Sequence, residues 1–210
     1  MSGISAQGST LQIATGTGGP KTITGISVGF PAIVASAAHG LNNGDVVVLA
    51  AIVGTMSSLN STAHTVSNKT AGTFALLDVD TTGLVYTSGG TATPNVYTKI
   101  NGILSFDGFD GTADELDVTD LDSTAKEFIS GIKDEGKFGF EAKTLKTDAG
   151  QIALRANRTS GAVVGMKLAL PDASVASFNV IVKSMPTSGG VNAVLKGKID
   201  CRISGPVVWS

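Results

Sequence analysis

Carboxylate side chains are concentrated in residues 114–128, which read DELDVTDLDSTAKEF. Six of these fifteen residues are Asp or Glu, in a chain that has only 17 such residues in total. A cluster of this kind could bind a hard cation, supply an acid pair for catalysis, or dock against another copy of the protein. The rest of the sequence has to discriminate among these three kinds of site.

The spacing of the carboxylates argues against a calcium site. Calcium loops alternate Asp or Asn ligands and close with a Glu, and the carboxylates of this region do not follow that order. The residues concerned are Asp107, Asp110, Asp114, Asp117, Asp120 and Asp122. Two of them could form a glycosidase acid pair, but sugar stacking would need more aromatic side chains than the 8 Phe, 2 Tyr and 1 Trp of this chain. Both interpretations are therefore less favoured than a docking surface.

Other residue types that carry chemistry lack the spacing of a catalytic or cofactor site. His39 and His64 have no His, Cys or Glu nearby at the spacing of zinc ligands, and we expect His39 to bond backbone groups in a turn. The glycine-rich TGTGGP at residues 15–20 lacks the Lys-Ser/Thr ending of a phosphate loop. The single cysteine, Cys201, is expected to be a buried structural thiol in a strand. The sequence thus predicts no enzyme activity, no cofactor and no metal.

Charge and hydropathy limit the classes of partner. The net charge is −2 and the pI about 5.6, whereas a protein that grips nucleic acid needs a basic face. No run of about 18 apolar residues occurs, so no membrane span is predicted. The amino-terminal MSGISAQGST lacks the basic start and the apolar centre of a secretion signal. We therefore expect synthesis and retention in a cytoplasm.

The elements that position these residues are predicted to be mainly strands. The chain has 27 Gly and many Val, Ile and Thr, a balance that favours strands and turns. Short apolar runs divided by turn residues predict strands along the whole chain. These runs are TITGISV, AIVASAA, VVVLAAIV, HTVSN, TFALLDV, LVYTSGG, YTKINGILSFDGF, KFGFEAKTL, VVGMKLALP, ASFNVIVKSMP, AVLKGKIDCRIS and VVW.

Two segments carry helix signals. In DAGQIALRANR, Asp148 is a good amino-terminal cap for a helix. Thr124 and Glu127 have the spacing of a capping box, and the apolar side chains within residues 128–132 follow it. We therefore expect one helix after Asp148 and a second, short helix that begins near Thr124.

Charge density changes sharply along the chain and divides it into two parts. Residues 21–93 carry 5 charged side chains in 73 residues, whereas residues 94–210 carry 27 in 117. The short apolar runs of residues 21–93 are typical of a small antiparallel unit. This change predicts that residues 21–93 form a small β domain of their own.

Four segments around and after the carboxylate cluster carry a resemblance to a known family. They are INGILSFDGFDGTADELDVTDLDSTAKEFISGIKDEGKFGFE, then DAGQIALRANRTSG, MKLALPDAS and CRISGPVVW. Together they resemble the tail tube proteins of long, non-contractile-tailed bacteriophages. The most specific segment is DVTDLDSTAKEFISGIKDEG, and the resemblance covers residues 1–15 and 94–210.

This resemblance implies a tail-tube-type β-sandwich or barrel with one flanking helix, located in the virion tail. Six copies would form a ring, and rings would stack into a tube through which the genomic DNA passes without specific binding. Tape measure, tail tip and tail terminator proteins would be further partners. The loop would contact a neighbouring subunit or ring, where Lys or Arg could pair with its carboxylates and set the register. The expected contact residues are Asp114, Glu115, Asp117, Thr119, Asp120, Asp122, Ser123, Glu127 and Phe128.

Residues 21–93 have a separate resemblance. Their AAHGLNNGDVV, HTV, TFAL and TSGG are similar to a small β module that recurs in phage structural proteins and is related to a half-domain of the ubiquitin-activating enzyme. No activity follows from this kinship. It implies an insertion after the strand SAQGSTLQIA, so that residues 1–20 and 94–210 form a discontinuous tube domain. We expect the module on the tube exterior, or alternatively between successive rings.

Two alternative functions remain open at the sequence level. The tube of a tail-like secretion or contractile device would share the fold and differ only by context. An adhesive, carbohydrate-binding β module of a virion is a further alternative, although it would be expected to expose Trp or Tyr platforms, and the chain has only 1 Trp and 2 Tyr.

Overall fold

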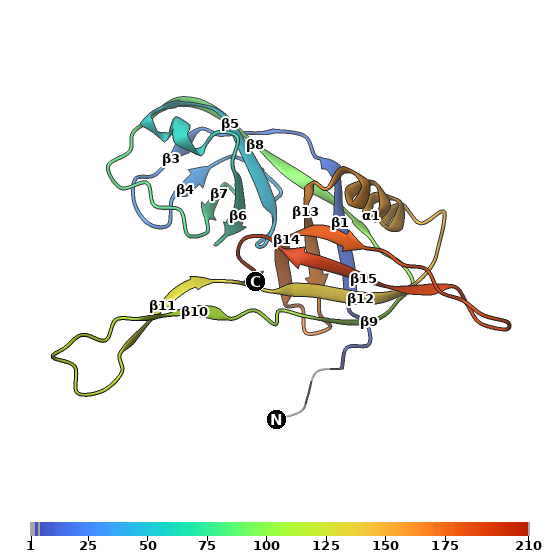
Figure 1. Ribbon diagram of the computed structural model, residues 1–210. Coiled ribbons are helices and arrows are strands. Elements are labelled where there is room, and N and C mark those ends of the chain that lie inside the picture. The colour runs from blue at the N-terminus through green and yellow to red at the C-terminus, as the bar shows by residue number, and fades with distance from the viewer. Residues whose placement is uncertain (1–2, 4, 210) are drawn as a thin grey trace. The chain divides into compact units, whose positions relative to one another are not determined.

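Antiparallel strands are the main secondary structure. The computed structural model describes residues 3 and 5–209 (Figure 1). They form two compact units: unit 1 takes its residues from 1–99, 165–177 and 208–210, and unit 2 takes its residues from 100–164 and 178–207. The predicted fold class, mainly β with one α-helix, is confirmed for the described part of the chain.

Unit 1 is built from strands and a single turn of 3-10 helix. Two of its strands, β13 and β14, continue into unit 2. Its elements are β1 (Thr10–Thr17), β2 (Lys21–Thr22), β3 (Gly25–Ile26), β4 (Ile33–Ala35), β5 (Val46–Gly54), η1 (Thr55–Leu59), β6 (Ala63–Ser67), β7 (Thr73–Leu76), β8 (Tyr86–Lys99), β13 (Val163–Ala169), β14 (Val175–Ser184) and β16 (Val208–Trp209).

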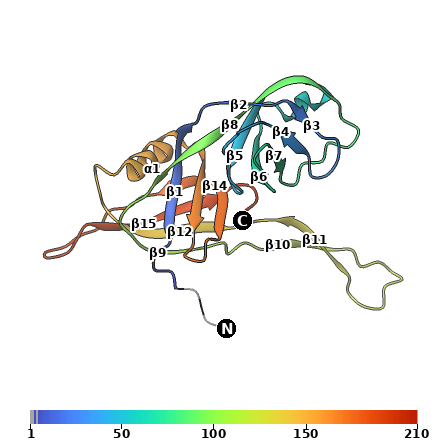
Figure 2. The ribbon, with the colours of Figure 1, turned by 180° about the vertical axis from the view of Figure 1, so that it is seen from behind.

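The long strand β8 connects the two halves of the hydrogen-bonded ladder in unit 1. The ladder runs in the order β3-β4-β7-β6-β5-β8-β1-β13. The first part of β8 pairs with β5, as in Val48↔Thr93, and its last part pairs with β1, as in Gln12↔Lys99. Figure 2 shows β8 running from β5 to β1. One strand therefore belongs both to the predicted module and to the predicted tube domain.

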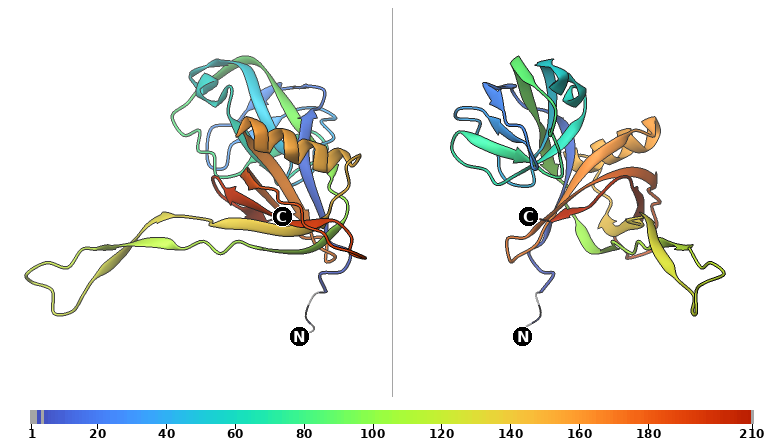
Figure 3. Two further views of the ribbon diagram at one scale, coloured as in Figure 1. Left: turned by 45° about the vertical axis from the view of Figure 1, so that its right-hand side comes forward. Right: turned by 90° about the vertical axis from the view of Figure 1, so that its left-hand side faces the viewer.

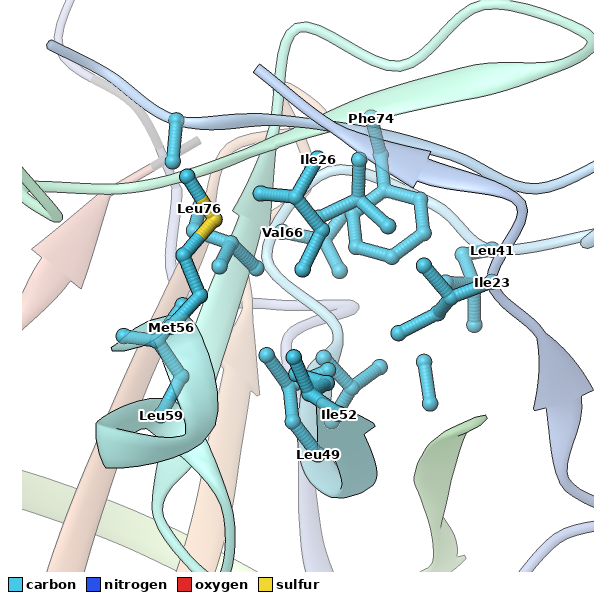
Figure 4. Close-up of a cluster of buried hydrophobic side chains, with 14 residues drawn as sticks. Ile23, Ile26, Leu41, Leu49, Ile52, Met56, Leu59, Val66, Phe74 and Leu76 are labelled. Carbon is cyan, nitrogen blue, oxygen red and sulfur yellow. The ribbon is translucent and has the colours of Figure 1, made fainter. Parts of the chain in front are cut away.

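Residues 21–93 surround a hydrophobic core of their own (Figure 4). Phe74 of β7 is fully buried and lies opposite Val34 of β4 in the strand register. The buried members of the cluster are Ile23, Ile26, Ala32, Val34, Leu41, Val47, Leu49, Ile52, Met56, Leu59, Val66, Phe74, Leu76 and Ala92. Because unit 1 continues beyond this core to residue 99, the predicted domain bounds at 20/21 and 93/94 stay a prediction.

Unit 2 contains a second ladder, a separate hairpin and the α-helix. The ladder runs in the order β14-β15-β12-β9, and the hairpin consists of β10 and β11. The elements that lie wholly in unit 2 are β9 (Ile103–Gly108), β10 (Ala113–Asp117), β11 (Phe128–Lys133), β12 (Lys137–Lys143), α1 (Ala149–Ser160) and β15 (Lys196–Ile203).

Strand β15 of the unit 2 ladder alternates strictly between a buried apolar face and an exposed charged face. In β15, Ile199 and Cys201 are buried whereas Lys198 and Arg202 point to solvent, which is the period of two expected of a half-buried strand. The buried face carries an aromatic cluster that includes Phe138 and Phe178, whose ring centroids lie 4.9 Å apart. This face is the core of unit 2.

Helix α1 begins after Asp148, as the sequence predicts. Asp148 caps the amino terminus, and its side chain accepts a hydrogen bond from the backbone N–H of Gln151. Gly161 ends the helix in the left-handed conformation, with φ of 69°, which glycine adopts without steric cost. No helix in the described part of the chain is long and apolar enough to cross a membrane.

The second predicted helix, which should begin near Thr124, is wrong. Residues 128–133 form strand β11, which pairs with β10 through Leu116↔Ile129 and Asp117↔Phe128. The sequence from Phe128 contains Ile, Ser and Gly, which have modest or poor helix propensity. Strand β10 offers these residues a hydrogen-bonding partner, so the pairing of two segments overrides the local capping signal.

Candidate functional site: the arm

The hairpin β10–β11 and its flanking residues form an extension of unit 2, which we call the arm (residues 109–135). Figure 1 and Figure 3 show the arm extending away from the ladder of unit 2. All residues of both strands are exposed except the half-buried Gly131. The nine predicted contact residues all lie on this arm, in β10, in the tip loop 118–127, or at the start of β11. The structure therefore brings the whole predicted set to one projecting element.

Apolar side chains of the arm lie in solvent on both of its faces. Leu116 and Ile129 are cross-strand neighbours, each 52% exposed, and Val118 follows on the same face by the alternation of the strand. Phe128, which is paired with Asp117, lies on the other face, and Ile132, beyond the register shift of the hairpin, is 86% exposed. An isolated two-stranded hairpin is at best marginally stable in water, and clustered exposed apolar residues are typical of an interaction surface. Phe128 belongs to the predicted contact residues, whereas Leu116, Val118, Ile129 and Ile132 were missed as contact residues by the sequence reasoning, although the alternation of LDV gave a signal for the first two.

The tip of the arm is ordered by its own side chains. Asp117 Oδ1 accepts a hydrogen bond from the backbone N–H of Thr119 at 2.9 Å, and Thr119 Oγ1 accepts one from the N–H of Glu127 at 3.0 Å. Asp120 Oδ1 accepts hydrogen bonds from the N–H of Asp122 and from the hydroxyl of Ser123, both at 3.0 Å. The loop therefore holds a defined shape before it meets any partner.

The carboxylates of the arm cluster differ in whether they form an ion pair. Lys126 Nζ lies 3.4 Å from Asp117 Oδ2. The hydroxyl and the N–H of Thr119 lower the pKa of Asp117. In the described part of the chain, the other five carboxylates of the predicted cluster make no ion pair; they are Asp114, Glu115, Asp120, Asp122 and Glu127. Within the same residues no group of three or more His, Cys, Asp or Glu is arranged to hold a metal ion.

The base of the arm is fixed to the ladder by two ion pairs. Asp134 pairs with Arg202 of β15, and Asp110 lies 3.9 Å from Lys137 of β12. Hydrogen bonds from the backbone N–H groups of Gly136 and Lys137 are the main cause of the lowered pKa of Asp134 and Asp110, respectively. These ion pairs thus fix the orientation of the base of the arm relative to the ladder. The two strands beyond the base are exposed.

Two side chains that the sequence singles out elsewhere in the chain, His39 and Cys201, are buried. His39 is buried, its Nδ1 accepts from the N–H of Leu41, and its Nε2 donates to the carbonyl of Thr70, both at 3.0 Å. The prediction that His39 bonds backbone groups is confirmed. Cys201 is buried in β15, as predicted, and burial raises the pKa of its thiol to about 12.

One buried polar cluster in unit 1 had no sequence signal. Lys167 of β13 binds Asp45 at 2.7 Å, and its ammonium lies 4.6 Å from the ring centroid of Tyr97. Ser177 of β14 donates a hydrogen bond to the carbonyl of Gly44 at 2.8 Å. These contacts attach the loop HGLNNGD to β13 and β14, across more than a hundred residues of sequence.

Comparison with known proteins adds no further assignment. No protein-family model matches the chain, and no curated protein matches it at a significant level. The arm is therefore interpreted from its own geometry and chemistry.

Proposed function

We propose that this protein is a structural subunit that assembles with copies of itself into hexameric rings, which stack into the tail tube of a long, non-contractile-tailed bacteriophage. The observation that carries the proposal is the arm. It projects from unit 2, exposes apolar side chains on both faces, and consists largely of DVTDLDSTAKEFISGIKDEG, the segment on which the resemblance to tail tube proteins chiefly rests.

The energetics of the arm favour a docked state. Full burial of a Leu, Ile or Phe side chain stabilises a contact by about 1.5–3 kcal/mol, and Leu116, Phe128, Ile129 and Ile132 are each at least half exposed. The ordered tip lowers the entropy cost of docking because its loop is already shaped. Unpaired carboxylates around these apolar residues would select one register rather than add much affinity. The arm thus has the properties of a subunit contact.

The end of the unit 2 ladder supports the same proposal. Strand β9 is the last strand of this ladder, and the free edge of such a strand can pair with a strand of another chain. Six copies joined in this way could close a continuous barrel around a lumen. The net charge of −2 would let genomic DNA pass without tight binding. Tape measure, tail tip and tail terminator proteins would contact such a tube, and its location would be the virion tail.

Residues 21–93 have a different place in this proposal. They have a self-contained core of buried apolar side chains, although Val28, Phe30, Ile33, Val53 and Val85 of this segment are exposed. We therefore assign them to the tube exterior rather than to the ring contacts.

Electron microscopy of the purified protein, concentrated at moderate salt, tests the proposal. We expect hollow tubes of uniform width, and we expect the triple variant D117N/D120N/D122N to stay folded but to polymerise less. If the wild-type protein remains monomeric at every protein and salt concentration tested, the proposed self-assembly is wrong. Wild-type tubes with an unchanged yield in the triple variant would remove only the role of the tip carboxylates.

A further inference from the structure

The two ends of the unit 2 ladder differ in chemistry. Strand register places Lys137 opposite Arg202 at the end that continues into the arm, and Lys143 opposite Lys196 at the other end. The seven residues of β12 separate the two ends, which corresponds to roughly 20 Å of strand. Figure 1 shows the arm leaving one end and the loop between β14 and β15 leaving the other. Unit 2 therefore presents two distinct surfaces in opposite directions.

The end away from the arm is basic. We call Lys143, Lys146, Arg155 and Lys196 the basic end. Lys143 and Lys196 are directly opposite each other, an arrangement of like charges that destabilises a strand pair. The Arg155 guanidinium donates to the carbonyl of Lys146 at 2.9 Å, which brings a further cation to this end.

Carboxylates of the same chain neutralise this end only in part. Glu141 pairs with Lys196 at 2.8 Å. Asp148 accepts hydrogen bonds from Asn101 and from the N–H of Gln151 instead of binding a cation. In the described part of the chain, the other three cations of the basic end make no ion pair.

Exposed apolar side chains accompany these cations. The loop that follows β14 carries Val191, Val194 and Leu195, which are 96%, 65% and 48% exposed. The backbone N–H of Thr144 donates to the carbonyl of Leu195 at 2.8 Å, so this loop is tied to the segment that follows Lys143. The basic end thus combines unpaired cations with apolar groups, as the arm combines unpaired carboxylates with apolar groups.

We propose that the basic end is the surface that receives the arm of a second copy of this chain, an inference that rests on the proposed self-assembly. Carboxylates of the arm tip bind Lys143, Lys146 and Arg155, while the apolar side chains of the arm pack on Val191, Val194 and Leu195. Because the two surfaces differ, the contact is heterologous and joins copies head to tail, a geometry that produces rings or filaments instead of closed dimers. A docked carboxylate supplies Lys143 with the partner that Lys196 already has in Glu141.

Charge-reversal variants of the full chain test this pairing. The basic-end variant K143E/K146E and the arm variant D120K/D122K are each expected to raise the protein concentration needed for assembly at least tenfold, measured by sedimentation velocity. An equimolar mixture of the two variants should recover assembly, because every arm in the mixture then meets an end of opposite charge on the other variant. Folding of each variant is checked by circular dichroism. The control variant K21E/K69E changes the net charge by the same amount as K143E/K146E and should assemble like the wild type.

The possible outcomes separate this proposal from the proposed function. If the arm variant loses assembly while the basic-end variant assembles normally, the receiving surface lies elsewhere and self-assembly through the arm still stands. If the wild-type protein does not assemble at any concentration, both the proposed function and the docking of the arm on the basic end are wrong. The basic-end variant could also assemble normally but fail to retain a DNA fragment that the wild-type protein retains. That result would overturn the proposal and assign the basic end to nucleic acid.

A second measurement needs no substitution. Carbodiimide joins carboxylates to lysines only where they are in contact. A mixture of isotopically labelled and unlabelled wild-type chains should give cross-links between residues 114–127 of one chain and Lys143 or Lys146 of another. Cross-links from the arm to other lysines, with none to these two, would overturn the proposal.

Discussion

Residues 21–93 and the arm use apolar side chains in opposite ways. The first segment carries only 5 charged residues and buries an apolar cluster around Phe74 within itself. The arm is rich in charge, yet Leu116 and Ile132 remain in solvent because no other element of unit 2 covers them. The comparison teaches that hydropathy alone does not tell which segment has a core. What matters is whether the apolar residues find partners within the same chain.

The largest effect that tests this contrast is the loss of an aromatic ring. Phe74→Ala removes a fully buried side chain from the cluster of residues 21–93, which should lower the free energy of unfolding by about 3–5 kcal/mol. The matched variant Phe128→Ala removes a ring that is 52% exposed on the arm, and should cost less than about 1 kcal/mol. Urea unfolding of both variants measures the difference.

Equal destabilisation by the two Phe variants would break the comparison. It would mean that the ring of Phe128 is packed in the isolated chain. Phe128→Ala should instead act on assembly, which sedimentation velocity measures on the same samples.

Ion pairs provide a second test because residues of both regions form them, with different degrees of burial. Asp45→Asn leaves Lys167 without its partner at a site where only 11% of the Lys167 side chain and 24% of the Asp45 side chain is exposed. Removing one partner of a fully buried pair costs about 3–5 kcal/mol, and the partial exposure here reduces the expected loss to about 2 kcal/mol. Lys126→Gln breaks the exposed pair with Asp117 on the arm, and should leave the urea midpoint unchanged.

The double variant D45N/K167M sharpens this result. Because it removes both charges, it should recover most of the stability lost in Asp45→Asn. If Asp45→Asn alone proves neutral, the ammonium of Lys167 reaches solvent or is held sufficiently by Tyr97.

Excision of the arm should have a smaller effect on stability. The N–H of Phe109 donates to the carbonyl of Lys137 at 3.1 Å, so the two ends of the arm are close enough to be joined by a short turn. A chain in which Asn-Gly replaces residues 111–134 should keep its thermal midpoint within about 3 °C and lose assembly. A cooperative unfolding transition that disappears in this variant would show that the arm belongs to the core of unit 2.

Sequence patterns predicted the elements of this fold well where the signal is local. Alternation in KIDCRIS gave β15, and Asp148 gave the start of α1. The same local reasoning failed for the segment from Thr124, because the partner strand β10 decides its conformation and a capping box contains no information on strand pairing. Composition pointed to the carboxylates of the arm, and the full set of candidate residues is what the resemblance to tail tube proteins implies. Their exposure, and the pairing of Asp45 with Lys167, depend on contacts between segments far apart in the sequence.

The smallest predicted effect concerns a single carboxyl group at the tip of the arm. The hydroxyl and the N–H of Thr119 lower the pKa of Asp117. Because the folded-state pKa is lowered, the ordering of the tip by Asp117 is fully present above the ordinary Asp pKa, and is lost as pH falls through the folded-state value. Thr119→Val removes the hydroxyl and keeps the N–H, so the pKa of Asp117 should rise part of the way to its ordinary value in an NMR titration of the carboxyl carbons.

Thr119→Ser keeps the hydroxyl and serves as the control for this titration, with the pKa of Asp117 expected to remain low. An unchanged pKa in Thr119→Val would show that the backbone N–H and Lys126 suffice to hold the carboxylate in its charged form. In either variant the unfolding midpoint at neutral pH should not move, since the groups concerned are exposed on an arm without a core. A change confined to the arm would confirm that its tip is ordered locally, whereas residues 21–93 are ordered by burial.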